Sequence, residues 1–364
     1  MATAATRERA TTAVVEHTDP RAWDELIAGL GGQPFQAWAW GELKSRFGWQ
    51  PYRFSSADGR SAAQVLIRPF RGLAVAYVPR GPVGSQAGYV DEQLLDHIVG
   101  LARSRRAAFL RFEPDVLQSD RSAEAVHTFF TARGFRTAEL TLGQRSSIRL
   151  DLSPPTEELF ASFSKGHRAD IKRAAREGVQ VRTGSDMADA EALQRMLAAT
   201  AERKSVSYHA AAYYHAMCAA FGDSARIFLA EHDGEVVAGS MILSWGDNGL
   251  YLFAGSNRRG LETRAGHLLQ WQAIQWARER GNTTWDLWGI SDARGKLELL
   301  RQDGVPDDTP EMKALAAEAE SDPKDRLQRF KKGWGGYIVR ALPAYDKVFI
   351  PPVYWLWARR RGED

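Results

Sequence analysis

The sequence predicts an α/β protein built from two tandem copies of one module, and three observations carry this prediction. Two stretches read as strand, Asp-Gly turn, strand, and their turn residues Asp58 and Asp233 lie 175 positions apart. An Asp-Gly pair between two hydrophobic runs is a strong hairpin signal. The strand that follows each hairpin carries a tyrosine, Tyr77 or Tyr251, at a spacing of 174. The chain has 364 residues, of which 44% are hydrophobic, so it contains enough apolar side chains for two cores.

The same order of elements continues through both copies. Each copy has a helix after its strand, and Leu94 and Leu268 in these helices are again 174 residues apart. A strand (A-F-L-R-F-E-P-D-V or T-T-W-D-L-W-G-I-S-D) follows, then a helix that ends in an aromatic residue and a glycine. The order hairpin, strand, helix, strand, helix, strand is that of a GCN5-related acyltransferase (GNAT) half. The predicted fold class is therefore α/β (α+β), with two tandem GNAT-like halves whose mixed sheets are flanked by helices.

The predicted first half covers residues 1–150, with an N-terminal extension, and the second covers 151–364. A linker helix at 156–178 is rich in lysine and arginine. Such a run is either a solvated helix face or a surface for a polyanion such as RNA. Residues 296–325 are charged and alanine-rich with proline breaks, so we expect an inserted, exposed loop with one short helix.

Composition restricts the classes of function. The net charge of +3 permits a phosphate-bearing partner without requiring one. The single cysteine, Cys218, excludes a disulfide within the chain and is expected to be a small core residue. No apolar run has the length of a transmembrane helix, and the N-terminus has no signal-peptide core. We therefore expect a cytoplasmic protein that requires no metal or other cofactor.

Seven sequence blocks, taken together and in order, resemble the Fem family of peptidoglycan bridge-forming aminoacyltransferases. They lie between about Gln33 and Pro351 and read F-Q-A-W-A-W-G-E-L-K, Y-V-P-R-G-P-V, L-R-F-E-P-D-V, K-G-H-R-A-D-I-K-R-A, H-L-L-Q-W-Q-A-I-Q-W-A, W-D-L-W-G-I and R-F-K-K-G-W-G-G. The resemblance implies transfer of an amino acid (Gly, Ala or Ser type) from aminoacyl-tRNA, the co-substrate, to the stem-peptide amine of a muramyl-pentapeptide precursor. That precursor is either lipid-linked or UDP-linked.

The chemistry is attack of an amine on an activated ester. It requires alignment of two substrates, stabilisation of an oxyanion and acceptance of a proton. Lys331 is the first candidate for oxyanion and tRNA-end stabilisation, with the neighbouring Lys332 as the alternative, and Phe330 is expected to stack on the terminal adenine. Glu113 is the candidate that holds the acceptor amine or relays its proton. The family more often has aspartate at this position.

The remaining candidates bind substrate. By the same resemblance, Lys44, in the aromatic block with Trp38, is expected on the precursor diphosphate. Arg264, ahead of a helix N-terminus, is expected on a second phosphate, with Arg258 and Arg259 of the same loop as the alternatives. The other four are Arg80, Tyr77, Tyr251 and Asp115, which follow or lie on the strands expected to line the site; for the tyrosines, core packing competes with this role.

Two other functions compete with this one. A coenzyme A-dependent N-acetyltransferase would need a glycine-rich pyrophosphate loop, but the corresponding stretch, R-R-G-L-E-T-R-A-G-H, has the wrong glycine spacing and carries Glu262. The second competing function is that of a repurposed or non-catalytic Fem-like protein that binds tRNA. The aromatic and then basic C-terminal tail, F-I-P-P-V-Y-W-L-W-A-R-R-R, either contacts a membrane peripherally or packs as a terminal helix. The oligomeric state is left open.

Overall fold

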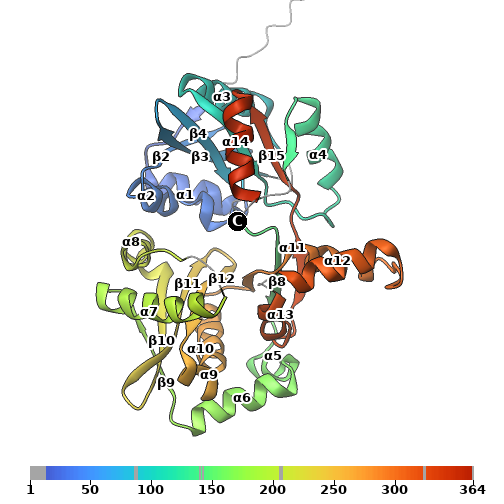
Figure 1. Ribbon diagram of the computed structural model, residues 1–364. Coiled ribbons are helices and arrows are strands. Elements are labelled where there is room, and N and C mark those ends of the chain that lie inside the picture. The colour runs from blue at the N-terminus through green and yellow to red at the C-terminus, as the bar shows by residue number, and fades with distance from the viewer. Residues whose placement is uncertain are drawn as a thin grey trace, which may run out of the picture. The chain divides into compact units, whose positions relative to one another are not determined.

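The computed structural model describes residues 14–85, 89–138, 141, 143–204, 208–322 and 325–362. The chain forms two compact units. Unit 1 contains Met1–Val116, Asp120–Leu140 and Ala344–Asp364, and unit 2 contains Leu117–Ser119 and Thr141–Pro343. Each unit is a mixed sheet flanked by helices, as the sequence predicts (Figure 1).

The sheet of unit 1 has the strand order β1-β2-β3-β4-β6-β15-β7, with β5 paired to β3. All of its neighbours are antiparallel except β4 and β6, which are parallel. The strands are β1 (Val15–Glu16), β2 (Gln50–Ser55), β3 (Ser61–Phe70), β4 (Leu73–Pro79), β5 (Val83–Gly84), β6 (Ala107–Glu113), β7 (Arg136–Ala138) and β15 (Ala344–Val348). Its helices are α1 (Pro20–Gly29), α2 (Trp38–Ser45), α3 (Glu92–Ser104), α4 (Ala123–Ala132) and α14 (Pro351–Gly362), with the short η1 (Pro34–Gln36).

The sheet of unit 2 has the order β14-β8-β13-β12-β11-β10-β9, in which only β12 and β13 are parallel. The strands are β8 (Ser146–Asp151), β9 (Gln180–Gly184), β10 (Ala225–His232), β11 (Glu235–Trp245), β12 (Asn248–Ser256), β13 (Thr284–Gly289) and β14 (Tyr337–Arg340). The helices are α5 (Thr156–Ser162), α6 (Lys165–Arg176), α7 (Met187–Lys204), α8 (Ala211–Phe221), α9 (Arg258–Glu262), α10 (Ala265–Glu279), α11 (Asp292–Gln302), α12 (Pro310–Ser321) and α13 (Asp325–Lys332), with the short η2 (Gly222–Ser224).

The two sheets have equivalent strands, which agrees with the predicted duplication. The Asp-Gly turns join β2 to β3 and β10 to β11, and Asp233 and Gly234 both have the positive φ of a tight hairpin turn. In each unit the next strand (β4 or β12) leads to a helix and then to a parallel partner (β6 or β13).

The unit boundaries differ from the predicted halves because two strands cross over. After β7, the chain continues into β8, which pairs with β13 and β14 in the second sheet. After β14, it returns as β15, which pairs with β6 and β7 in the first sheet. The strand β8, which follows the first copy in the chain, thus belongs to the second sheet. The strand β15, which follows the second copy, belongs to the first sheet. A boundary drawn at residue 150 places residues 117–119, 141–150 and 344–364 in the wrong units, because strand pairing between distant segments leaves no local mark in the sequence.

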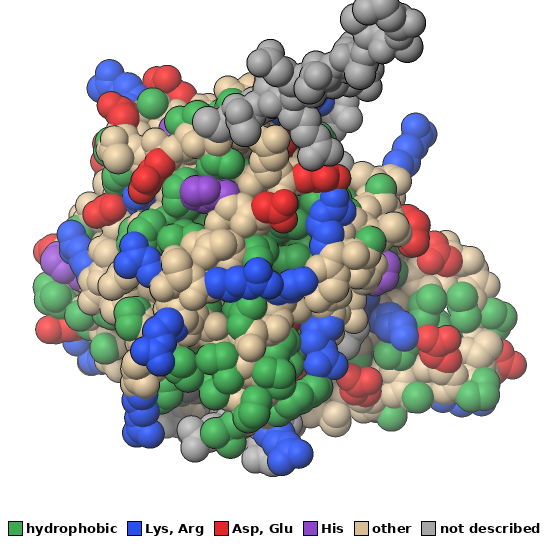
Figure 2. Space-filling model, turned by 90° about the horizontal axis from the view of Figure 1, so that it is seen from above, with side chains coloured by type: hydrophobic (Ala, Val, Ile, Leu, Met, Phe, Trp, Pro, Cys, Tyr) green, Lys and Arg blue, Asp and Glu red, His purple; other side chains and the backbone are tan. Residues whose placement is uncertain are grey.

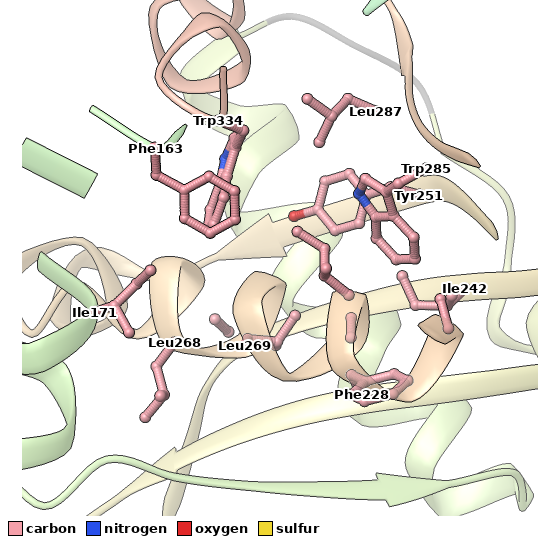
Figure 3. Close-up of a cluster of buried hydrophobic side chains, with 14 of the residues drawn as sticks. Phe163, Ile171, Phe228, Ile242, Tyr251, Leu268, Leu269, Trp285, Leu287 and Trp334 are labelled. Carbon is pink, nitrogen blue, oxygen red and sulfur yellow. The ribbon is translucent and has the colours of Figure 1, made fainter. Parts of the chain in front are cut away.

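Helices cover both faces of the second sheet. Phe228 on β10 packs with Trp276 of α10, whereas the glycine Gly239 on β11 faces Leu193 of α7. The core on the α10 side contains large aromatic residues, of which Phe163, Trp285 and Trp334 are at most 1% exposed (Figure 3). Cys218 is also buried, as predicted, and burial raises the pKa of its thiol to about 11.

Two predicted segments differ from the structure in how their helices are arranged. The linker at 156–178 is two helices, α5 and α6, because Ser164 caps α6 by accepting a hydrogen bond from the His167 amide. The inserted segment contains α11 and α12, which bury a small apolar cluster of their own, with Leu297 and Met312 at its centre. It is therefore a packed helical pair and not an exposed loop with one short helix.

Candidate functional site

The parallel strands separate in unit 2 but not in unit 1. In unit 2, β12 pairs with β13 only from Asn248 to Leu250, and the register of β13 shifts after Asp286. In unit 1, β4 and β6 stay paired as far as Pro79 and Glu113. The ends of β12 and β13 in unit 2 therefore present backbone groups that do not pair with each other, and such groups are suited to an extended ligand.

The end of β13 has an unusual backbone. Trp288 is in the left-handed region, with φ 61°, although it is not a glycine. Asp286 holds this turn by accepting a hydrogen bond from the Trp288 amide at 2.8 Å. The other carboxylate oxygen of Asp286 accepts a hydrogen bond from Arg149 Nε at 3.0 Å. Strained backbone of this kind is often found at functional sites.

Lys331 reaches this turn from the last turn of α13. Its ammonium donates to the carbonyl oxygens of Trp288, at 3.1 Å, and Gly289, at 2.5 Å. The side chain is buried, whereas that of the neighbouring Lys332 is 68% exposed and lies 4.0 Å from Glu298. The structure thus separates the two lysines, which the sequence did not: Lys331 places its charge at the end of the separating strands, and Lys332 faces solvent.

Phe330 belongs to an aromatic and histidine cluster that the sequence did not predict. Its ring lies 5.0 Å from that of His267, and its carbonyl oxygen accepts a hydrogen bond from His167 Nε2 at 2.7 Å. The His167 ring in turn packs at 5.0 Å from Trp334. The side chain of Phe330 is only partly buried, so one part of the ring reaches the surface. The K-G-H-R-A-D block of α6 and the H-L-L-Q-W block of α10 supply the histidines, and only the fold brings them together.

Arg264 lies at the edge of this cluster, immediately before α10, and has a positive φ of 59°. Its Nε is 3.6 Å from Asp170, a carboxylate that also lies 3.6 Å from His267 Nε2. An anion bound here would compete with Asp170 for the guanidinium. Burial, then the neighbouring His167, lowers the pKa of His267 to about 4, so that ring is neutral at neutral pH.

Tyr251, on β12, starts the part of the strand that has separated from β13. Its ring is buried against Trp285, and burial raises the pKa of its hydroxyl. Figure 3 shows this hydroxyl pointing toward Trp334 and Phe163, and it makes no hydrogen bond within the described part of the chain. Core packing is therefore the main contribution of Tyr251.

The other predicted residues lie in unit 1, where two pairs form at the ends of β4 and β6. The Tyr77 hydroxyl donates to Glu113 Oε2 at 2.7 Å, and both side chains are buried. Burial, reinforced by the Glu113 carboxylate, raises the pKa of Tyr77 well above its ordinary value. Arg80 Nη1 lies 3.5 Å from Asp115 Oδ1.

Lys44 is at the end of α2, with its ammonium 4.9 Å from the centre of the Trp40 ring. Burial, and then the charge of Arg68, lowers the pKa of Lys44 to about 8. Trp38 begins the same helix, and the Arg53 guanidinium carbon lies over its ring, 3.4 Å from the ring centre. Trp38 is therefore a packing partner of Arg53, whereas Lys44 is a partly buried cation held near a second positive charge, an arrangement that an anion would relieve.

The comparisons with known proteins agree with this architecture. A sequence profile of the FemAB family matches residues 32–236, more than half of the chain. The chain is 28% identical over 275 residues to the UDP-N-acetylmuramoylpentapeptide-lysine N(6)-alanyltransferase of Weissella viridescens, covering 71% of this chain and 80% of the relative. It is 21% identical to the lipid II:glycine glycyltransferase of Staphylococcus aureus (strain USA300), covering 89% of this chain and 90% of that one.

Solved structures show the same fold. The crystal structure of FemX superposes with a TM-score of 0.78 at 18% identity, covering 95% of this chain and all of that one. A tandem GNAT protein from the clavulanic acid biosynthesis pathway gives a TM-score of 0.53 at 13% identity, covering 92% and 98%. The predicted tandem GNAT-like fold and the predicted family are both confirmed. The chain belongs to the FemAB family of aminoacyltransferases.

Proposed function

We propose that this protein transfers a small amino acid, such as alanine or glycine, from aminoacyl-tRNA to the stem-peptide lysine or equivalent amine of a peptidoglycan precursor. The named activities of the relatives, an alanyl and a glycyl transfer onto such precursors, support the acceptor and the class of amino acid. The tRNA donor comes from the family resemblance and from the chemistry below.

One observation carries the proposal: the buried Lys331 ammonium lies at the end of β13, where β12 and β13 separate. In the reaction, the acceptor amine nitrogen forms a bond to the aminoacyl carbonyl carbon. The ester bond to the terminal ribose then breaks, and the ribose oxygen leaves with a proton that comes from the amine. A fixed positive charge near that carbonyl stabilises the oxyanion of the tetrahedral intermediate, and it does so most effectively in a site from which water is excluded.

Phe330 supports the same donor. Its partly exposed ring is adjacent in sequence to Lys331 and is fixed by its contacts with His267 and Trp334. A rigid aromatic face beside the reacting ester is suited to stacking on the terminal base of a tRNA. The exposed cations of α6 (Lys165, Lys172, Arg173 and Arg176) lie on the opposite side of that helix from its buried His167, and they offer phosphate contacts for the same RNA.

The acceptor is assigned to residues of unit 1. Lys44, with its lowered pKa, is proposed to bind a precursor phosphate, because a phosphate would compensate the charge that burial and Arg68 disfavour. Glu113 is proposed to hold the acceptor amine through its carboxylate. Its hydrogen bond from Tyr77 orients the carboxylate for that role.

A coenzyme A donor is disfavoured by the loop before α10. A pyrophosphate site there would need free backbone amides. Instead, the Gly260 amide donates to the Asn257 side chain at 2.9 Å, and the Thr263 amide donates to the Arg259 carbonyl at 2.9 Å. The short helix α9 thus uses amides that a pyrophosphate loop would leave available.

The experiment is transfer of a radiolabelled amino acid from a charged tRNA pool to a lysine-containing muramyl pentapeptide. Parallel reactions contain RNase or replace the tRNA with acetyl-coenzyme A. We expect transfer that RNase abolishes and that Lys331→Ala removes. Lys332→Ala, which deletes the same side chain one position later on the exposed side, is the matched control and is expected to keep transfer. Transfer from acetyl-coenzyme A alone would overturn the proposal.

A further inference from the structure

Exposed hydrophobic side chains and cations are neighbours on this protein, as the face drawn in Figure 2 illustrates. One such combination in unit 1 has a marked charge bias. Three segments, residues 45–49, 68–73 and 103–106, contain six arginines and no aspartate or glutamate. We call these segments the arginine-rich end; its arginines are Arg46, Arg68, Arg71, Arg103, Arg105 and Arg106.

The three segments are neighbours in the fold. The Arg68 guanidinium lies 5.7 Å from the centre of the Trp49 ring, which joins the first segment to the second. The amide of Ala74, one residue after the second segment, donates to the carbonyl oxygen of Arg106 in the third segment at 3.0 Å. The arginine-rich end is therefore one continuous surface at the turns of a single sheet.

The arginines of this surface are exposed and are not neutralised. All six side chains are exposed, and none forms an ion pair with a described residue. Elsewhere many exposed arginines are paired, as Arg173 is with Glu177 and Arg258 with Glu262. Like charges that gather without counter-ions destabilise a surface unless an anionic partner compensates them.

Two large hydrophobic side chains share the surface. Phe70 is 60% exposed and Phe47 is 37% exposed. Phe70 is the last residue of β3, directly before the turn to β4, with exposed Pro69 before it and Arg71 after it. Phe70 pairs with Leu73 across that turn, so the hairpin backbone is hydrogen-bonded near its tip. A hairpin of this kind can enter a lipid headgroup layer without leaving many unpaired backbone groups.

Arg71 occupies a position that favours other residues. It has φ 48° and precedes Gly72 at φ 77°, which is the geometry of a two-residue hairpin turn that prefers Asn, Asp or Gly. Arg106, at φ 56°, is in the same backbone region. Both positions carry a cation despite a local conformational cost, which is consistent with a role for the charge.

We propose that the arginine-rich end docks unit 1 on an anionic lipid bilayer, with Phe70 and Phe47 in the headgroup layer. Arginines around exposed aromatic side chains are suited to this partner, because the cations attract anionic headgroups and the rings enter the interface. This contact does not depend on the proposed transfer. One consequence does rest on the proposed transfer. The charge of Arg68 also lowers the pKa of Lys44, so a bilayer bound at Arg68 would present the phosphates of a lipid-linked precursor beside the proposed phosphate-binding lysine.

The test is flotation of the full chain with vesicles of phosphatidylcholine alone or with phosphatidylglycerol added. We expect binding to the anionic vesicles only, weakened by salt. Arg68→Gln with Arg71→Asn is expected to lower the partition coefficient roughly 30-fold, from two headgroup contacts. Asparagine tolerates the positive φ at position 71, so the turn is kept. Phe70→Ser is expected to weaken binding at high salt as well.

Two further variants keep the result specific. Lys172→Gln with Arg176→Gln removes the same charge from α6 and is expected to leave vesicle binding unchanged. Trp355→Ser with Leu356→Ser tests the C-terminal helix α14, which exposes both side chains. Vesicle binding lost in the α14 variant but kept in the Arg68/Arg71 variant would overturn the proposal. So would an Arg68/Arg71 variant that loses tRNA binding in a gel shift and keeps vesicle binding. Vesicle flotation does not require amino-acid transfer, so a failure of vesicle binding can be distinguished from a failure of the proposed transferase activity.

Discussion

The Lys331 ammonium is 2.5 Å from the carbonyl oxygen of Gly289, so the end of α13 is attached to the end of β13. This contact places a buried positive charge where the two parallel strands of unit 2 separate. A second carbonyl, that of Trp288, shares the same ammonium, and this residue has a left-handed backbone that Asp286 helps to hold. The pair Lys331 and Gly289 is therefore both a structural connection and the centre of the proposed donor site.

Replacing Lys331 with alanine is expected to lower kcat roughly 100- to 1,000-fold, the usual cost of removing one oxyanion-stabilising group. Single-turnover transfer would measure the effect, and a thermal melt of the same sample would report the structural part. The Lys332→Ala control is expected to stay within about two-fold of the parent, since an exposed cation of this kind contributes little. A Lys331→Ala protein with a lower Tm but unchanged kcat would mean that the lysine serves stability alone.

Lys44 predicts a pH dependence of acceptor binding. Its pKa is lowered to about 8, so the ammonium loses its proton as the pH rises through that value, and its attraction for phosphate is lost with it. The KM for the precursor should therefore rise between pH 7 and pH 9. In Lys44→Arg the charge persists over this range, and the KM should stay flat. Parallel KM curves for the two proteins would contradict a phosphate contact at this position.

Gly333 provides a test of the packing that holds Phe330 and Lys331. A Cβ atom at this position would overlap the His167 ring, which packs against the turn after α13. Gly333→Ala is expected to cost about 2 kcal/mol of unfolding free energy through overpacking. Adding His167→Ala makes room for the methyl group, so the two costs should not add. Urea unfolding of both single variants and the double variant gives the coupling, and additive costs would show that the ring and the glycine are independent.

His267 predicts how stability depends on pH. Its folded pKa of about 4 lies below the ordinary value of 6.5, chiefly because of burial and then because of His167. The unfolded chain therefore binds a proton here between pH 6.5 and pH 4 while the folded chain does not, so stability falls as the pH falls through this window. Asp170 and Arg264 also face the ring, with opposite effects on its charge.

Replacing the His267 ring should reduce the loss of stability between pH 6.5 and pH 4. In His267→Gln, the drop in unfolding free energy from pH 6.5 to pH 4 should be about 2 kcal/mol smaller than in the parent. The remaining slope would include His167, whose pKa is also lowered by burial. Chemical denaturation at intervals across the window measures both curves, and identical slopes would show that His267 is not the group responsible.

The sequence by itself determined the duplicated module, since Asp58 and Asp233, and Tyr77 and Tyr251, mark matching hairpins and strands. These features are local: turn residues and hydrophobic periodicity act over a few neighbouring positions. The family resemblance also singled out Lys331 and Lys44. It favoured Lys331 over Lys332 only by the alignment of the matched block, because burial is a property of the packed helix and not of the residue type.

Only the tertiary structure decided which strands belong to which sheet and which side chains meet. The exchange of β8 and β15 between the sheets joins segments far apart in the chain, such as Arg111 on β6 and Asp346 on β15, whose buried ion pair links residues 235 positions apart. The cluster of His167, His267 and Phe330 arises in the same way, from three helices whose sequences carry no sign of one another. Contacts of this kind depend on how faces pack after the elements have formed, and the packing in turn fixes which of the predicted side chains lie at the separated strands and which remain in the core.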